Sequence, residues 1–152
     1  MPFLSGEYEC KPDVKGRMVL PSALKAVWPE ASCGRIVIVR GFEPCIVAYP
    51  KSEWEKIFSR VSGLNEFNEE YRSFQRNFFR GNTEAELDKN GRFLIPKSML
   101  TYSGINGRAI VVGLSNRIEI WDPARYENYL IKDAAEFSRM AQKYLGSDRT
   151  EA

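Results

Sequence analysis

The first half of the chain alternates short apolar runs with turn-forming residues. Residues 35–40 read Arg-Ile-Val-Ile-Val-Arg, a β-branched run that follows Gly34 and is typical of a strand. Gly41 and Pro44 mark a turn into the next strand. The pattern predicts strands at residues 4–10, 17–20, 35–40 and 45–49, with a short helix at residues 22–28. We expect the first two strands to pair with each other as a hairpin.

The same order of elements returns in the second half. Gly81 precedes the first strand of this half, and Gly107 precedes its third strand, as Gly34 does in the first half. The pattern predicts strands at residues 82–87, 93–95, 107–113 and 117–121, with a short helix at residues 97–102. Each half is therefore predicted to fold as β-β-α-β-β, and the chain as a whole as an α+β protein.

Longer helical patterns follow each half. Residues 50–61 and 66–79 predict two helices between the halves, separated by a break. A third pattern, capped by Asp122, predicts one continuous helix to about residue 145. The apolar stripes are Trp54, Ile57, Phe58 and Val61; Phe67, Tyr71, Phe74 and Phe78; and Tyr126, Leu130, Ala134, Phe137, Ala141 and Tyr144. Such aromatic stripes favour a core or an interface over nucleobase stacking, and the last one needs either the Trp54 helix or a neighbouring subunit as its partner.

One five-residue motif occurs in each half, at a constant spacing of 75 residues. Residues 13–17 read Asp-Val-Lys-Gly-Arg, and residues 88–92 read Asp-Lys-Asn-Gly-Arg. A short apolar strand follows each copy and ends at a proline, Pro21 or Pro96. Aspartate favours the start of a turn and glycine supplies a positive φ angle, so each copy predicts a tight loop that presents one arginine.

The composition narrows the class of protein. Hydrophobic residues make up 43% and charged residues 28% of the chain, which is ordinary for a soluble globular protein. No apolar run approaches the roughly 20 residues that span a bilayer, and the N-terminus lacks the features of a signal peptide, so we expect a cytoplasmic protein. The chain has no histidine, which removes the commonest general base and metal ligand. Cys10, Cys33 and Cys45 lack metal-type spacing and predict reduced, packed thiols, so we expect no cofactor or metal.

Length and charge distribution add two expectations. Two modules of fewer than 80 residues each rarely hold adequate cores alone, so the halves are expected to complete each other. Residues 11–40 carry six basic and two acidic side chains, whereas the whole chain has a net charge of only +2. This local excess favours an anionic partner.

The expected divisions are domains at residues 3–52 and 80–124, a helical connector at 53–79, a C-terminal helix at 125–145 and a disordered tail at 146–152.

The repeated loops admit three interpretations. They could be purely structural, with aspartate binding backbone N–H groups and pairing with the arginine. Asp13 and Asp88 could form a catalytic carboxylate pair, although each lies four residues from an arginine that would hold it ionised. Finally, loops carrying Lys15 and Arg17 could enter a DNA groove, where lysine neutralises phosphate and arginine reaches guanine with two hydrogen bonds. The absence of a nearby nucleophile, metal set or phosphate loop disfavours catalysis.

A resemblance to known proteins favours the third interpretation. The β-β-α-β-β pattern with its Asp-x-x-Gly-Arg turn resembles the SpoVT/AbrB-type DNA-binding domain, a swapped-hairpin barrel. Two such units in tandem resemble the MraZ family of bacterial regulators, which are linked to the division and cell-wall gene cluster. The matching stretches are residues 13–17 with Pro21, residues 76–84, residues 87–92 with Pro96, and residues 118–121. The first copy departs from the pattern at Pro12, where the second copy has Leu87.

The resemblance implies a nucleoid-associated, sequence-specific transcriptional regulator without catalytic activity or a small-molecule substrate. It would bind direct repeats in double-stranded promoter DNA as an octamer-like homo-oligomeric ring. The expected DNA-binding residues are Lys15, Arg17, Lys89 and Arg92, and the expected loop-organising residues are Asp13, Gly16, Asp88 and Gly91. The main rival is a scaffold protein of the same fold whose loops pair charges between subunits. The antidote of a toxin–antitoxin pair is a third use of the fold.

Overall fold

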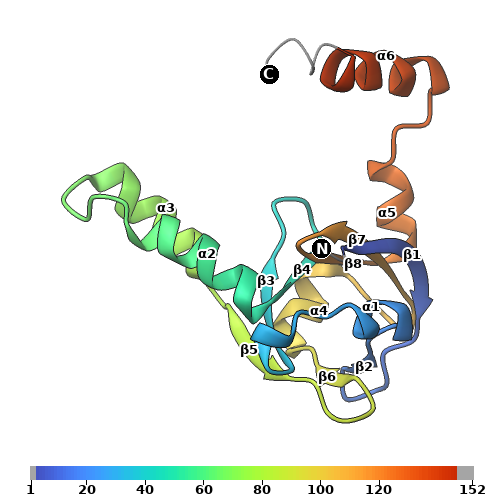
Figure 1. Cartoon of the computed structure of the whole chain (residues 1–152), viewed down its shortest axis with the longest axis horizontal. Coiled ribbons are helices and arrows are strands. Elements are labelled where there is room, and N and C mark those ends of the chain that lie inside the picture. The colour runs from blue at the N-terminus through green and yellow to red at the C-terminus, as the bar shows by residue number, and fades with distance from the viewer. Residues whose placement is uncertain (1–2, 147–152) are drawn as a thin grey trace.

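The chain folds into a body of strands and short helices, from which two helical segments extend (Figure 1). The structure, a computed structural model, describes residues 3–146, so most of the predicted tail lies outside it. The strands are β1 (Leu4–Cys10), β2 (Arg17–Val19), β3 (Arg35–Arg40), β4 (Ile46–Pro50), β5 (Thr83–Glu86), β6 (Arg92–Leu94), β7 (Ala109–Ser115) and β8 (Ile118–Trp121). The helices are α1 (Ser22–Ala26), the 3₁₀ turn η1 (Glu30–Ser32), α2 (Lys51–Ser62), α3 (Glu69–Phe79), α4 (Lys97–Ser103), α5 (Pro123–Tyr129) and α6 (Ala134–Leu145). The predicted α+β class is confirmed.

The two halves exchange strands. A six-stranded sheet has the order β1-β7-β8-β4-β3-β5, and a separate two-stranded sheet joins β2 to β6. The first strand of each half therefore pairs with the third strand of the other half: β1 runs antiparallel to β7, and β5 runs antiparallel to β3. Within each half only the final hairpin, β3–β4 or β7–β8, is local. The halves thus complete each other, as their small size predicts.

The predicted hairpin between residues 4–10 and 17–20 is wrong. Backbone bonds between them are confined to the turn, where the Asp13 N–H donates to the Arg17 carbonyl at 2.9 Å and the Gly16 N–H donates to the Asp13 carbonyl at 3.0 Å. Its strands then separate: β1 pairs with β7 over the whole length from Leu4 to Cys10, and β2 pairs with β6. In a local hairpin, β1 could form backbone hydrogen bonds only along the three residues of β2. Pairing with β7 instead gives β1 a hydrogen-bonded partner along all seven of its residues.

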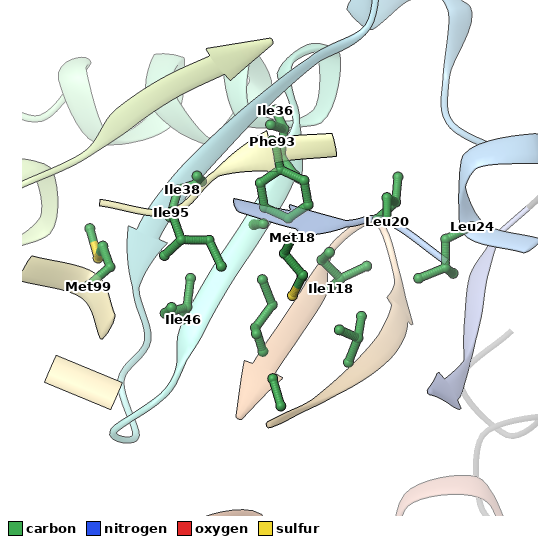
Figure 2. Close-up of a cluster of buried hydrophobic side chains, with 14 of the residues drawn as sticks. Met18, Leu20, Leu24, Ile36, Ile38, Ile46, Phe93, Ile95, Met99 and Ile118 are labelled. Atoms are coloured by element: carbon green, nitrogen blue, oxygen red, sulfur yellow. The ribbon is translucent and has the colours of Figure 1, made fainter. Parts of the chain in front are cut away.

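The main core contains matched side chains from both halves (Figure 2). Met18 and Phe93 lie at equivalent positions of the repeat and are 1% and 2% exposed. Equivalent positions on the segments that follow are also paired in this way: Leu20 matches Ile95, and Leu24 matches Met99. All six side chains belong to one buried cluster. Each such side chain contributes about 1.5–3 kcal/mol by leaving water. Because the cluster mixes both halves, neither half holds this core by itself.

Helices α2 and α3 form an antiparallel arm that projects from the body (Figure 1). Trp54 is 8% exposed and stacks on Phe78, with ring centroids 5.7 Å apart, so the predicted stripes meet each other. The second helix begins at Glu69 rather than at the predicted residue 66. The Asn68 side chain accepts the Tyr71 N–H at 3.0 Å and caps the helix there, which leaves Phe67 outside it and 86% exposed.

The predicted continuous C-terminal helix is also wrong. Leu130 has extended backbone angles and ends α5, and α6 begins only at Ala134. Asp133 accounts for the break, because its carboxylate accepts the Ala135 N–H at 3.0 Å and starts a new helix. Helix α6 buries no residue, so its apolar stripe does not pack on the Trp54 helix.

The exposure of the three cysteines differs from the expectation. Cys45 is buried and Cys10 is partly buried, but Cys33 is exposed, which corrects the prediction that all three thiols are packed. Cys33 sits in the left-handed region, with a φ of 51°, at the end of η1. Among residues 3–146, no helix is both long enough and apolar enough to cross a membrane.

Candidate nucleic-acid interface

The first repeated loop is organised by the carboxylate of Asp13. Its Oδ1 atom accepts the backbone N–H groups of Lys15 and Arg17, both at 2.9 Å. Its Oδ2 atom accepts the Arg17 Nε–H at 2.8 Å. The Gly16 N–H closes the turn on the Asp13 carbonyl at 3.0 Å. One side chain therefore fixes both the backbone of the loop and the direction of its arginine.

The second loop has the same geometry at equivalent positions. Asp88 Oδ1 accepts the N–H groups of Asn90 and Arg92 at 2.8 and 2.9 Å, and Oδ2 accepts the Arg92 Nε–H at 2.9 Å. The Gly91 N–H bonds to the Asp88 carbonyl at 2.9 Å. The agreement between the copies shows that the five-residue motif specifies its own conformation, as the turn chemistry predicts.

Each loop also rests on the opposite half of the molecule. Gly16 and Gly91 have φ angles of +87° and +78°, which glycine adopts without strain. The Gly16 carbonyl accepts the Ile95 N–H at 2.9 Å, and the Gly91 carbonyl accepts the Leu20 N–H at 2.8 Å. Both loops thus lie at the same end of the molecule, below β2 and β6 in the view of Figure 1.

The electrostatics of the loops disfavour proton transfer by the aspartates. Bonds from the backbone N–H and the side chain of Arg17 lower the pKa of Asp13, and Arg92 lowers the pKa of Asp88 in the same way. Both carboxylates are therefore ionised at neutral pH and bound to their own arginines. Each arginine side chain is 48% exposed. Within residues 3–146, the terminal nitrogens of both guanidinium groups bond to no other residue, so they remain available to an external acceptor.

The two-stranded sheet presents the arginines beside apolar side chains. Arg17 lies opposite Leu94, and Val19 lies opposite Arg92, in the β2–β6 register. Val19 and Leu94 are 52% and 53% exposed, whereas Met18, between Arg17 and Val19, is buried. Sequence reasoning missed Val19 and Leu94 as parts of this surface. The available signal was the period of two along a strand, which places Val19 on the same face as Arg17 and Leu94 on the same face as Arg92.

The tips of the loops differ in the side chains they expose. Val14 is fully exposed and precedes Lys15, whereas Lys89 precedes Asn90 in the second loop. Two further lysines lie nearby that the sequence did not single out. Lys25 Nζ donates to the Lys89 carbonyl at 2.7 Å, and Lys97 shares a shallow hollow with Lys15. The surface therefore gathers more positive charge than the repeated motif alone indicates.

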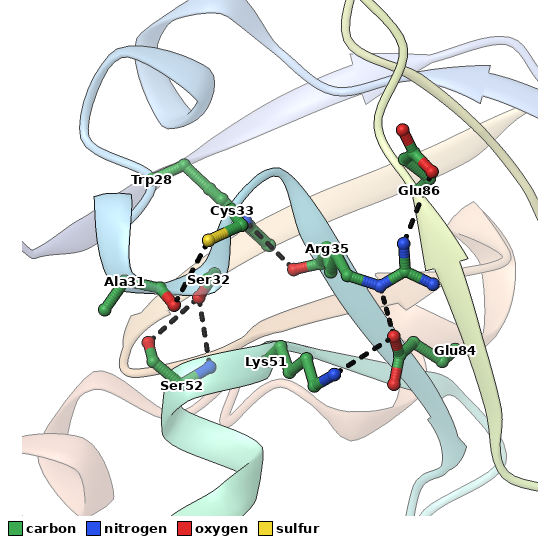
Figure 3. A network of polar contacts seen from close by, with 9 residues as sticks. All are labelled: Trp28, Ala31, Ser32, Cys33, Arg35, Lys51, Ser52, Glu84 and Glu86. Carbon is green, nitrogen blue, oxygen red and sulfur yellow. Dashed lines mark hydrogen bonds and ion pairs between the residues drawn. The ribbon is translucent and has the colours of Figure 1, made fainter.

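Arg35, which lies in the predicted positive region, serves the strand exchange instead. Arg35 on β3 pairs with Glu84 and with Glu86 on β5, and Lys51 also contacts Glu84, at 3.4 Å (Figure 3). The Arg35 hydrogen bond is the main reason that the pKa of Glu84 is lowered. Arg108 pairs with Glu9 at 2.8 Å across the equivalent β7–β1 contact. These ion pairs join the two halves, so they account for Arg35 without an external anion.

Metal ligands do not converge in the part of the chain that the structure describes. No group of three or more histidine, cysteine, aspartate or glutamate side chains there could hold a metal ion.

The arrangement of the loops is suited to binding an anionic groove surface. The loop arginines are already ordered before binding, so fewer side-chain rotamers are lost when they bind.

Comparisons with known proteins match nearly the whole chain. The family model for "MraZ protein", whose description also terms the family antitoxin-like, matches twice, over residues 3–77 and 78–148. The Transcriptional regulator MraZ of Cytophaga hutchinsonii is 54% identical over 99% of this chain and 100% of its own length. The Transcriptional regulator MraZ proteins of Christiangramia forsetii and a Roseiflexus species are each 38% identical, over 95% and 91% of this chain and 94% of their own lengths.

Proposed function

Because this chain belongs to the MraZ family, we propose that it is a transcriptional regulator that binds double-stranded promoter DNA through its two loops. The observation that carries the proposal is the duplicated loop geometry, in which Arg17 and Arg92 are each fixed through Nε by an aspartate. Within the described part of the chain, such a loop leaves the terminal nitrogens of the guanidinium free for a ligand. A purely structural turn does not require two exposed arginines in register.

The loops would contribute different kinds of contact. Arg17 and Arg92 can each offer two parallel N–H donors to the O6 and N7 atoms of guanine or to a phosphate. Lys15 and Lys89 at the exposed tips can neutralise phosphates. Asp13 and Asp88 position the arginines, and Gly16 and Gly91 allow the turns. The relatives' names support regulation without catalysis, and the corresponding place of action would be the cytoplasm, on nucleoid DNA.

The test replaces each loop arginine and measures DNA affinity against salt. Arg17→Ala and Arg92→Ala should each weaken binding to the DNA upstream of the chain's own gene, without unfolding the protein. Loss of a phosphate contact should lower the salt slope by about one, whereas loss of a base contact should cost about 1–3 kcal/mol and relax specificity. Arg108→Ala is the matched control, because Arg108 is also an exposed, carboxylate-paired arginine but belongs to neither loop, and its own thermal unfolding is measured beside that of the loop variants. Unchanged affinity in both loop variants would favour the scaffold interpretation.

The finer part of the proposal is a ring that binds direct repeats. One subunit offers few cations, and a few contacts alone give weak, salt-sensitive binding. The arm carries exposed Phe74, and α6 carries exposed Phe137 and Tyr144, so apolar area remains for contacts between subunits. Head-to-tail contacts close into rings or extend into filaments. A ring would repeat the loops in one sense and could gain roughly 10²–10⁴ in avidity from linked sites.

Duplexes of equal length with one, two or three short boxes test this mechanism. Affinity should rise steeply with the number of boxes and fall when the boxes are shifted by half a helical turn. Native mass spectrometry of the free protein should show a closed oligomer, as in an octamer-like ring. Equal affinity for one and three boxes, or a protein that is only monomeric at micromolar concentration, would contradict the ring. The regulated genes, proposed to be those for division and the cell wall, follow from mapping the bound promoters.

A further inference from the structure

A second concave site lies beside α5, away from the DNA-binding loops. It is a cavity of about 400 Å³ between the exposed face of β7–β8, α5 and the turn that holds Glu43. In Figure 1, α5 lies at the opposite end of the body from the two loops that precede β2 and β6. Neither the strand exchange nor the proposed DNA contact uses this cavity, so its composition needs a separate explanation.

Three aromatic rings form one side of the cavity. The rings of Trp121 and Tyr126 have centroids 5.9 Å apart and are inclined by 51°. Those of Trp121 and Tyr129 are 5.2 Å apart and inclined by 43°. Trp121 is 3% exposed and therefore fixed, whereas Tyr129 is 53% exposed at the rim. Tyr126 and Tyr129 pack on Trp121, and all three side chains line the hollow, so a ligand in it would meet aromatic surface.

Carboxylates surround the same rings without basic partners. Glu119 accepts the Trp121 indole N–H at 2.9 Å, and Glu7 accepts the Tyr126 hydroxyl at 2.8 Å. Glu43 also lines the cavity. Within residues 3–146, none of these three carboxylates forms an ion pair. Burial, and then the bond to Glu7, raise the pKa of Tyr126 to about 12, so its hydroxyl stays a neutral donor.

We propose that this cavity, defined by Trp121, Tyr126 and Tyr129 with Glu43 and Glu119, binds an organic cation of the alkylammonium or guanidinium class. Ring faces attract such a cation, and carboxylates at the rim supply the opposite charge. A neutral or anionic ligand of the same size would gain neither term. The cation could be a free small molecule or a basic side chain from a second copy, for example from the exposed Arg72 or Arg76 of α3.

The test uses the full chain labelled with 5-fluorotryptophan. The chain has three tryptophans, so ¹⁹F spectra report the cavity through Trp121 and a remote site through Trp28. Tetramethylammonium chloride is titrated at constant ionic strength, with neopentyl alcohol as the neutral probe of equal shape. We expect a saturable shift of the Trp121 signal with tetramethylammonium only. Glu119→Gln keeps the indole acceptor but removes the charge, and it should raise the dissociation constant several-fold, as should Glu43→Gln and Tyr129→Leu.

Matched controls and mass measurements complete the design. Glu55→Gln and Phe3→Leu remove an exposed carboxylate and an exposed ring elsewhere and should leave the titration unchanged. If a basic side chain from another copy occupies the cavity, tetramethylammonium and the Glu43→Gln/Glu119→Gln double variant should both lower the molar mass measured by light scattering. If the cation is a free molecule, the mass stays constant while Trp121 shifts. An equal response to neopentyl alcohol, or no Trp121 shift together with an unchanged mass for the double variant, overturns the proposal.

Discussion

The two loop glycines provide a matched pair of perturbations, because only one of them is confined by backbone. A Cβ atom added at Gly16 would lie 2.7 Å from the Ile95 carbonyl oxygen and 3.2 Å from Leu100 Cδ1. At Gly91 the nearest atom would be Lys25 Cδ, at 3.2 Å, and the Leu20 carbonyl would be 3.7 Å away. A flexible lysine can move aside, but a carbonyl within the core segment cannot. Gly16→Ala should therefore destabilise the protein more than Gly91→Ala.

The magnitudes follow from two separate costs. Both substitutions place a Cβ in the left-handed region, at about 1–2 kcal/mol each. Replacing glycine also lowers the entropy of the unfolded chain, which returns about 0.4–1 kcal/mol. Gly91→Ala should thus cost roughly 1 kcal/mol. Gly16→Ala must in addition displace Ile95, whose N–H donates to the Gly16 carbonyl, and a lost hydrogen bond adds about 0.5–1.5 kcal/mol.

Thermal and denaturant unfolding at one fixed protomer concentration measure the difference, because assembly would make both depend on concentration. For a chain of this size, about 1 kcal/mol corresponds to a Tm change of roughly 2–4 °C. Gly16→Ala should therefore melt a few degrees below Gly91→Ala, with DNA affinity at low temperature reduced in the same order. Equal losses of stability in the two variants would refute the argument that each loop is supported by the opposite half through different atoms.

Two further predictions concern the charge and the asymmetry of the loops. The pKa values of Asp13 and Asp88 are lowered on folding, so their stabilisation is present above the ordinary aspartate pKa of about 3.9 and is lost as pH falls through the lower folded values. The protection of the Lys15 and Arg17 amides, measured relative to their intrinsic exchange rates, should therefore fall only as pH drops below about 3.9. Asp13→Asn should remove that dependence at the first loop only. Exchanging the tips, with Val14→Lys and Lys15→Asn in one loop and Lys89→Val and Asn90→Lys in the other, should reverse the orientation of the protein on one asymmetric box. A cleavage reagent tethered to the exposed Cys33 should then cut the opposite end of the box, and a cut that stays in place would contradict this prediction.

The sequence predicted the local elements better than their partners. The β-branched run at Arg35–Arg40 and the turn motifs act within a few residues, and the structure confirms them where they were predicted. Strand exchange depends on contacts between residues far apart in the chain, such as Glu9 with Ile110 and Arg35 with Glu86. Short-range periodicity cannot distinguish a local hairpin from an exchanged one, because both bury the same faces of the strands. The break between α5 and α6 has a local cause, the cap at Asp133. The prediction of one continuous helix was wrong because it gave more weight to the long apolar stripe than to this single capping residue.

The candidate interface shows the same division. The repeated Asp, Gly and Arg positions could be predicted because turn chemistry specifies them, whereas the roles of Arg17 and Arg92 in binding stay predictions. Lys25 and Lys97 approach the loops only through tertiary packing: Lys25 contacts the second loop from helix α1 of the opposite half. The aromatic and acidic cavity could not be predicted from the sequence either, because the turn at Glu43 and helix α5 meet only in the folded chain.

Joining the two halves in one chain removes a constraint that identical subunits would impose. In a symmetric dimer both loops must carry the same tip, and the dimer then suits a palindromic site. Here the two aspartate-organised backbones agree closely, yet one tip is Val14-Lys15 and the other is Lys89-Asn90. The supporting residues differ as well, because Leu100 lies behind the first loop and Lys25 behind the second. On the proposed function, a duplex lying across β2 and β6 would meet a more apolar loop on one side and a more basic loop on the other. The pseudo-twofold surface would then have a direction, which is the property that binding to direct repeats requires.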